Sequence, residues 1–347
     1  MTMTLGDISV RYVNLLLEFL TQQGLSTTEL KTQYQLSDTL LSQPEGRISI
    51  PRFMRFGHDC IQLSRSPHMG LQVAGLAQPS LLGLAGLSAA CAPSLGQALA
   101  DIAHDEPLSS KNVRGHSRFY REQSRGVAEF YSLSPYNQYN SFIVDMALAV
   151  QLILARRLTG QRLTPVAVDI EFPAPSYANL YAEVFECPVR FEQPRNALTL
   201  RAEDLSRPLR QSNRVAYAEC RQLCDQQLAR ISRSLSFLDQ VADAISPLLH
   251  TPDLTIQAVA VRLDLPVWTL QRKLKQQGTT FTQLLDNTRR ELALIYLRDE
   301  GYTIGEIAYL LGFTYPNAFQ RAFKRWTGEA PGDYRRRKAR NDSSEAY

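Results

Sequence analysis

The sequence predicts an α+β N-terminal domain, residues 1–230, followed by an all-α C-terminal domain, residues 231–340, in which two helix-turn-helix motifs are joined by a long helix. Three observations predict this architecture. The chain has 347 residues, too many for one ordinary core. Helical and strand-like periodicities both occur in the first two thirds. The last third contains an internal repeat of helical units, and residues 341–347 are expected to form a disordered tail.

Helices come first in the N-terminal domain. Apolar spacing predicts them at Val10–Gln22, Ser26–Tyr34, Pro51–Ser64 and Ser94–His104. Alternation then predicts strands at Ser117–Glu122 and Val127–Ser132. The intervening Gln123-Ser124-Arg125-Gly126 fits a hairpin turn. We therefore expect a small sheet after the helices.

A second group of elements follows the hairpin. The expected order is a long helix at Gln138–Leu158, a strand at Val166–Phe172, a helix at Tyr177–Phe185, and strands at Val189–Glu192 and Ala197–Arg201. The polar stretch Gln226–Ser234, rich in Arg and Ser, is the expected domain boundary. The helix before it, from about Asn213 to Gln227, is a candidate subunit contact, so we expect a homodimer. Packing of this helix on its own sheet is the alternative.

Composition and targeting signals indicate a cytoplasmic globular protein. Hydrophobic residues make up 44% and charged residues 21% of the chain. The apolar stretch near the N-terminus is interrupted by Glu18 and is followed by no small-residue cleavage site. No run reaches the roughly 18 apolar residues that a membrane span needs.

Cysteine and histidine usage predicts neither a disulfide framework nor a metal site. The five cysteines are scattered and form no ligand-spaced cluster with the five histidines: Cys60, Cys91, Cys187, Cys220 and Cys224. The chain also lacks a P-loop, a dinucleotide-binding glycine pattern and a nucleophile elbow. We therefore expect no cofactor and no enzymatic activity.

The repeat in the last third recurs at an offset of about 49 residues. Val259–Leu265 matches Ile307–Phe313, because both have an apolar residue, Ala, two variable positions and Leu before a residue able to adopt positive φ. That residue is Asp264 in the first unit and Gly312 in the second. Further along, Leu270–Leu274 matches Phe319–Phe323, and Gly278 matches Gly328 as a helix-ending glycine.

Each unit therefore predicts helix, tight turn, helix. Thr255 is the expected N-cap of the first unit, and Pro266 opens its second helix. Thr303 and Glu306 form a capping box at the start of the second unit. Between the units, apolar residues at helical spacing predict one connecting helix over Phe281–Arg298.

The second helix of each unit carries polar side chains opposite its apolar stripe. The residues expected to contact base edges are Trp268, Gln271 and Arg272 in the first unit, and Asn317, Gln320 and Arg321 in the second. Arg pairs with guanine, and Gln or Asn with adenine. Lys275, Lys324 and Arg325 are the expected phosphate contacts. The alternative is that these are ordinary solvated faces and that Trp268 belongs to the core.

Charge gives weaker support for a nucleic-acid partner. The net charge is only +4, but from Ile231 onward 16 Lys and Arg face 13 Asp and Glu. The segment Tyr334–Arg340 concentrates the excess. A basic terminal run is often only a solvated end.

The region from about Ile231 to Arg340 resembles the DNA-binding domain of the AraC/XylS family of bacterial transcription regulators. The matching phrases are Thr269–Leu274, Arg290–Ala293, Ile304–Ala308, Leu311–Phe313, Ala318–Gly328 and Pro331. The resemblance implies seven helices, a monomer contact spanning two successive major grooves of double-stranded DNA, and RNA polymerase as a partner. Pro266 and Asp264 depart from the family pattern, which commonly has Ser and Gly there.

The first 200 residues resemble the arabinose-binding-like N-terminal domain of an AraC subgroup that includes ornithine-utilisation and virulence regulators. The matching phrases are Cys91–Leu99, Phe185–Phe191, Pro194–Leu198 and Leu205–Leu209. This resemblance implies effector sensing or dimerisation and leaves the small-molecule effector unidentified.

Polar residues on the predicted strands are candidates for effector binding. Alternation places Arg118 with Tyr120 on one strand face, and Glu129 with Tyr131 on one face of the next. Asp169 and Glu171 are further polar strand residues. A polar sheet face beside aromatics could line a ligand pocket, or it could be the solvent face of an antiparallel sheet.

These observations favour a sequence-specific transcription regulator controlled by a small-molecule effector, an activator rather than a repressor by resemblance. A regulator without an effector is one alternative. An enzyme fused to a DNA-targeting domain lacks a catalytic constellation to support it. An architectural DNA binder would favour wedge residues and minor-groove contacts over two outward Gln and Arg helices.

Overall fold

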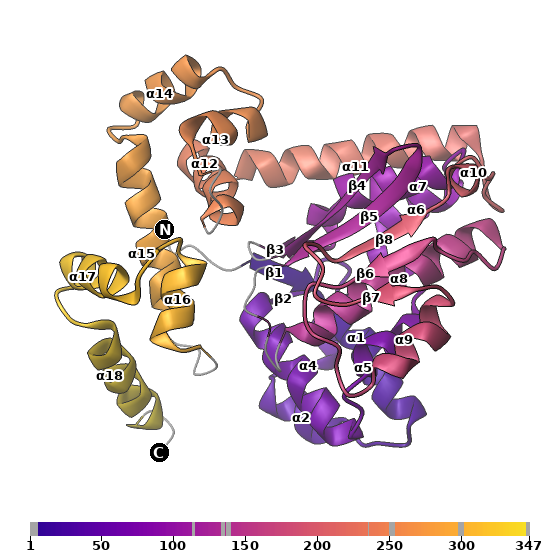
Figure 1. Ribbon diagram of the computed structural model, residues 1–347, viewed down its shortest axis with the longest axis horizontal. Helices are drawn as coiled ribbons and strands as arrows, with labels where there is room; N and C mark the ends of the chain where they lie inside the picture. Colours follow the sequence, from indigo (N-terminus) through magenta and orange to yellow (C-terminus); the bar gives the residue numbers. More distant parts are fainter. Residues whose placement is uncertain are drawn as a thin grey trace. The chain divides into compact units, whose positions relative to one another are not determined.

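The computed structural model describes residues 6–112, 115–132, 136, 140–234, 236–249, 254–297 and 302–344. The chain divides into two compact units, Gly6–Arg230 and Ile231–Tyr347. Figure 1 shows the first as sheets with helices and the second as helices. The predicted fold class, an α+β domain followed by an all-α domain, is confirmed.

The first unit begins with a small sheet that was not predicted from the sequence. Strands β1 (Gly6–Ser9), β2 (Arg47–Ser49) and β3 (Ser110–Asn112) are antiparallel in the order β2-β1-β3. Each strand has only three or four residues, too few for alternation to be visible in the sequence.

Short helices connect these strands. They are α1 (Val10–Gln22), α2 (Thr28–Gln33), α3 (Asp38–Ser42), α4 (Ile50–Ser64), α5 (Met69–Val73), α6 (Leu84–Cys91), α7 (Leu95–His104), and the 3₁₀ turns η1 (Ala74–Leu76), η2 (Pro79–Leu82) and η3 (Glu106–Leu108). The predicted helices at α1, α2, α4 and α7 are confirmed within two residues, whereas α3, α5 and α6 were not predicted. The apolar N-terminal residues Val13, Leu16 and Leu20 are fully buried in α1, as an amphipathic helix requires.

The second sheet contains the predicted hairpin. Strands β4 (Gly115–Glu122) and β5 (Arg125–Ser132) are joined by Gln123 and Ser124, both at positive φ, as a two-residue type I′ turn requires. Strands β6 (Ala167–Asp169), β7 (Val189–Arg190) and β8 (Ala197–Leu200) complete the order β4-β5-β8-β6-β7, in which only β6 and β7 are parallel. The strand at β6 is shorter than predicted, because the amide of Glu171 bonds to the Asn196 side chain.

Helix α8 (Ser141–Thr159) forms the core beneath this sheet. It contacts β5 and β8, and 13 of its 19 residues are buried. Residues 137–139, where the predicted helix began, lie outside the described residues. Helices α9 (Ala178–Phe185), α10 (Ala202–Leu205) and α11 (Arg214–Ser234) follow. The polar boundary expected at Gln226–Ser234 is the last part of α11 rather than a loop, because its Arg, Gln, Leu and Ala residues are good helix formers.

The second unit contains seven α-helices within its described residues. They are α12 (Phe237–Ile245), α13 (Ile256–Arg262), α14 (Val267–Gln276), α15 (Phe281–Tyr296), α16 (Ile304–Leu310), α17 (Pro316–Thr327) and α18 (Pro331–Ser344), with the 3₁₀ turn η4 (Ser246–Leu248) after α12. Figure 1 shows α15 running from α14 towards α16 and α17. Helix α18 continues to Ser344, so residues 341–344 are not the disordered tail that was expected. Residues 345–347 lie outside the described part.

Among the described residues, no helix is long and apolar enough to cross a membrane. The five cysteines are all free thiols. No group of three or more His, Cys, Asp or Glu side chains in the described segments could hold a metal ion.

Candidate nucleic-acid interface and ligand cavity

Helix α14 exposes the side chains expected to contact DNA. Leu270 and Leu274 are buried against the rest of the unit. Gln271, Arg272 and Lys275 lie on the exposed face. Trp268 is 62% exposed, so the alternative that places it in the core is wrong. The Arg272 guanidinium lies 5.2 Å from the centre of the Trp268 ring, which holds the two side chains together as a cation–π pair.

Helix α17 has the same division of faces. Phe319, Ala322 and Phe323 are buried, and the exposed residues are Asn317, Gln320, Arg321, Lys324 and Arg325. Arg325 pairs with Asp286 of α15 at 3.0 Å, so part of its charge is compensated within the protein. The two helices thus carry exposed Gln and Arg at equivalent positions of the repeat.

The turns between the paired helices have the backbone geometry that the repeat predicts. Asp264 and Gly312 both have positive φ, 51° and 73°. The second turn has no room for a side chain, because a Cβ atom at Gly312 would lie 1.7 Å from the carbonyl oxygen of Leu249. Asp264 is exposed, so its side chain is accommodated. The Thr255 cap and the Thr303–Glu306 capping box are confirmed, while Pro266 caps α14 without a side-chain hydrogen bond.

Arg289 of the connecting helix fixes the second turn. Its Nε donates to the carbonyl oxygen of Leu311 at 2.9 Å, and its guanidinium lies 4.9 Å from the centre of the Phe313 ring. Burial lowers the pKa of this guanidinium. The arginine satisfies a carbonyl at the end of α16, which otherwise has no helical partner.

The second unit also exposes three apolar side chains that were not predicted as site residues. Val261 and Tyr309 occupy equivalent positions in the two units and are 79% and 49% exposed. Tyr315, directly before α17, is 69% exposed. Val261 and Tyr309 could have been identified from the sequence, because they occupy equivalent positions in the repeat.

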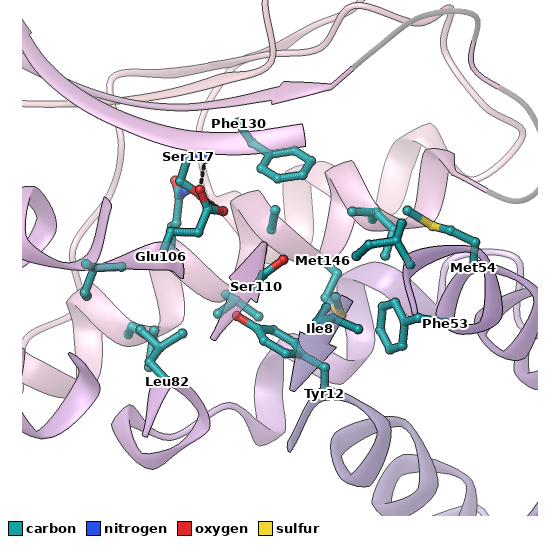
Figure 2. A pocket seen from close by; sticks show the side chains of 17 residues that line it. Ile8, Tyr12, Phe53, Met54, Leu82, Glu106, Ser110, Ser117, Phe130 and Met146 are labelled. Atoms are coloured by element: carbon teal, nitrogen blue, oxygen red, sulfur yellow. Dashed lines mark hydrogen bonds between the residues drawn. The ribbon is translucent and has the colours of Figure 1, made fainter. Parts of the chain in front are cut away.

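The first unit encloses a cavity of about 90 Å³ between its two sheets and helices α1, α4 and α8. Its lining is mostly apolar. Figure 2 shows two ends: Phe53, Met54 and Met146 lie at one, and the polar groups of Tyr12, Glu106, Ser110 and Ser117 lie towards the other. A mostly apolar lining with a few placed polar groups is typical of ligand sites.

Glu106 is the charged group of this cavity. Its carboxylate accepts hydrogen bonds from the backbone amide of Ser117 at 2.7 Å and from the Ser117 hydroxyl at 3.1 Å. It retains some accessible surface because it borders the cavity. Removal from bulk water raises the pKa of Glu106 to about 7, against the lowering effect of the two Ser117 bonds. Burial likewise raises the pKa of Tyr12 to about 12.

The four effector candidates from the sequence do not line this cavity. In the hairpin register Arg118 lies opposite Glu129, and Tyr131 lies opposite His116, so all four share the face that Tyr120 occupies. The cavity uses the other face, through Ser117 and Phe130. Alternation identified the shared face but could not tell which face borders a cavity.

Contacts within the protein account for much of this polar face. The Tyr120 hydroxyl donates to Glu129 at 2.7 Å, and Arg195 donates to the Tyr120 oxygen at 2.7 Å. Arg118 donates to His116 at 2.9 Å. The side chain of Tyr131 lies outside the described residues. Asp169 pairs with Arg190 at 2.7 Å, and Glu171 accepts from Asn196 at 2.8 Å.

Comparison with known families matches both units. The arabinose-binding domain of AraC transcription regulators matches residues 24–209, and a helix-turn-helix domain matches residues 259–337. The first match alone covers more than half of the chain.

Several known regulators match this chain over nearly its whole length. The ornithine utilization regulator of Pseudomonas aeruginosa is 29% identical over 94% of this chain and 96% of its own length. The regulator VirS of Mycobacterium tuberculosis is 25% identical over 96% of this chain and 98% of its own. Among solved structures, the regulator CdpR from Pseudomonas aeruginosa aligns over 94% of this chain and 98% of its own, with 21% identity and a TM-score of 0.48.

These relatives and domains are those of transcription regulators and not of enzymes. The chain therefore belongs to the AraC family of DNA-binding transcription regulators, in the group with an arabinose-binding-type N-terminal domain.

Proposed function

We propose that this regulator binds a specific operator through α14 and α17, each in one of two successive major grooves. Gln271 and Arg272 of α14, with Gln320 and Arg321 of α17, would contact base edges, assisted by Trp268 and Asn317. Lys275, Lys324 and Arg325 would contact phosphates. The supporting observation is the repeat itself, because an accidental solvated face has no reason to present Gln and Arg at equivalent positions twice.

The connecting helix supports a two-groove contact. Helix α15 has 16 residues and therefore a length of about 24 Å. The width of the paired helices at its two ends adds to this length. The two exposed helices could then approach the roughly 34 Å spacing of successive major grooves on one side of the duplex.

Base contact is tested on an operator selected from random duplexes with the full chain. Arg272→Ala and Arg321→Ala should each weaken operator binding by about 1–3 kcal/mol and relax preference at particular base pairs. Lys324→Ala should weaken all duplexes alike and flatten the salt dependence. Arg121→Ala, an exposed arginine of β4, is the matched control. Arginine variants that bind the selected operator as tightly as the parent would show that another face contacts DNA.

We further propose that a small molecule in the cavity of the first unit controls DNA binding. Glu106 borders the cavity, and the preceding residue, Asp105, pairs with Arg221 of α11. The Tyr217 hydroxyl of α11 also donates to Asp101 of α7 at 2.6 Å. A ligand that moves η3 would therefore act on α11, the helix that continues into residues 231–234 before the helix-turn-helix repeat.

The same proposal includes the direction of regulation, the oligomeric state and the location of the protein. The family resemblance supports an activator that contacts RNA polymerase, which transcription from a promoter carrying the selected operator would test. Exposed Val215 and Leu223 of α11 support a homodimer. The cytoplasm, where bacterial DNA lies, is the proposed location. If no small molecule alters DNA binding, the chain is an effector-independent regulator instead.

A further inference from the structure

The cavity holds a carboxylate without a cationic partner. The hydrogen bonds to the Glu106 side chain in the described structure come from Ser117, and no ion pair joins it to a described Lys, Arg or His. Such a carboxylate is costly to ionise in a low-dielectric site unless a positive charge is supplied. The remaining lone pairs of Glu106 are available to a donor inside the cavity.

The rest of the lining also offers acceptors rather than cations. None of the described residues around the cavity is Lys, Arg or His. The side-chain oxygen of Gln151, another lining residue, is buried and accepts no hydrogen bond from the described protein. A ligand carboxylate or phosphate would therefore meet Glu106 with no compensating charge, which disfavours acids, amino acids and phosphorylated compounds.

Size and polarity limit the ligand further. The volume of about 90 Å³ is smaller than the ~150 Å³ of an apolar cavity that holds benzene. Only a molecule of roughly four to six heavy atoms fits without rearrangement, although Met54 and Met146 are flexible enough to adjust. A sugar would bring more hydroxyl groups than this mostly apolar lining could satisfy.

We propose that the cavity binds a small primary amine as its ammonium ion, with Glu106 as counter-ion and the alkyl part among Phe53, Met54 and Met146. The ammonium group has three donors and no acceptor, which complements a carboxylate and the unpaired Gln151 oxygen. The apolar end of the cavity covers the carbon chain. The raised pKa of Glu106 agrees with a carboxylate that lacks its cation.

This inference deepens the proposed effector control and rests on it for its biological meaning, but binding is measurable without DNA. The probes are n-butylamine, n-butanol and butyrate, which share a chain and differ in the head group. Each is titrated into the full chain by calorimetry near pH 7.5, with ionic strength matched by NaCl. The amine should bind about ten- to hundredfold more tightly than the alcohol, as expected for a charge-assisted hydrogen bond, and butyrate more weakly than either.

Substitution of the counter-ion tests the assignment of the head group. Glu106→Gln keeps the shape of the side chain, so it should bind butanol as before while losing the preference for the amine. Glu183→Gln, an exposed glutamate of α9, is the matched control and should keep that preference. Ala147→Leu fills the cavity from α8 and should reduce binding of all three probes, which locates the site even if Glu106→Gln fails to fold.

Equal binding of amine and alcohol, tighter binding of butyrate, or an unchanged amine preference in Glu106→Gln would overturn the proposal. Unreduced amine binding in Ala147→Leu would place the amine elsewhere and also overturn it. Amine binding that leaves operator affinity unchanged would instead refute effector control by this cavity and leave the amine site standing.

Discussion

Substitution of Glu106 by Gln should leave the stability of the protein unchanged at acidic pH and raise it at alkaline pH. In the folded protein the pKa of this carboxyl is about 7, against 4.5 for a free glutamate. The fold therefore favours the protonated form. The contribution of this carboxyl to the stability of the fold is fully present below about pH 4.5 and is lost as pH rises through 7.

The difference between these pKa values, roughly 2.5, corresponds to about 3 kcal/mol lost by the wild type above pH 8. Glu106→Gln removes this pH dependence. It also replaces one carboxylate oxygen with an amide nitrogen, but both Ser117 contacts can be kept, because the Ser117 hydroxyl can accept a hydrogen bond from that nitrogen while the remaining oxygen accepts from the backbone amide. The variant should thus match the wild type at pH 4 and be about 3 kcal/mol more stable at pH 8.

The assay is urea unfolding of the full chain at pH 4 and pH 8. Both tryptophans, Trp268 and Trp326, lie in the second unit. Circular dichroism follows both units, while tryptophan fluorescence follows the second unit and should not change with the variant. Asp145, whose pKa burial also raises to about 7, remains in both proteins and cancels in the comparison. Wild-type and variant stabilities that change in parallel with pH would show that Glu106 does not have a raised pKa in the folded protein.

Three further predictions concern the contacts that join elements. Arg289→Met should destabilise the second unit by about 1–3 kcal/mol, because it leaves the Leu311 carbonyl without its side-chain donor. The midpoint of the tryptophan-fluorescence transition in urea measures the loss of stability, and an unchanged midpoint would contradict the prediction. Arg221→Met breaks the ion pair with Asp105. It should leave the affinity of the cavity for its ligand intact, measured by calorimetry, but abolish the effect of that ligand on operator affinity, measured by fluorescence anisotropy. Persistence of that effect would show another route between the units. If the proposed homodimer forms through α11, Leu223→Glu on its exposed face should convert it to a monomer in sedimentation equilibrium, with Gln222→Glu as a control on the same helix; a parent chain that is itself monomeric on operator DNA would contradict the dimer.

The cavity shows where tertiary structure was indispensable. Its lining comes from residues between Ile8 and Leu154, on strands of both sheets and on several helices. Three of the strands that help to assemble it are too short to show alternation. Ser117 and Phe130 face the cavity while their neighbours Arg118 and Glu129 face away. Alternation separates the two sets of residues, but it does not show which of the two strand faces borders a cavity.

In the second unit, local sequence patterns placed the two helix pairs and their connecting helix, whereas α12 and α18 were not placed. The repeat fixed the two helix pairs, the positive φ at Asp264 and Gly312, and the exposed faces of α14 and α17, because caps, turns and helical periodicity are local properties of the chain. The folded structure was needed to show that Arg289 bonds the second turn, that Arg325 is paired with Asp286, and that no Lys, Arg or His is among the described residues that line the cavity beside Glu106. Those outcomes depend on contacts between residues distant in sequence, and no periodicity records which distant residues meet.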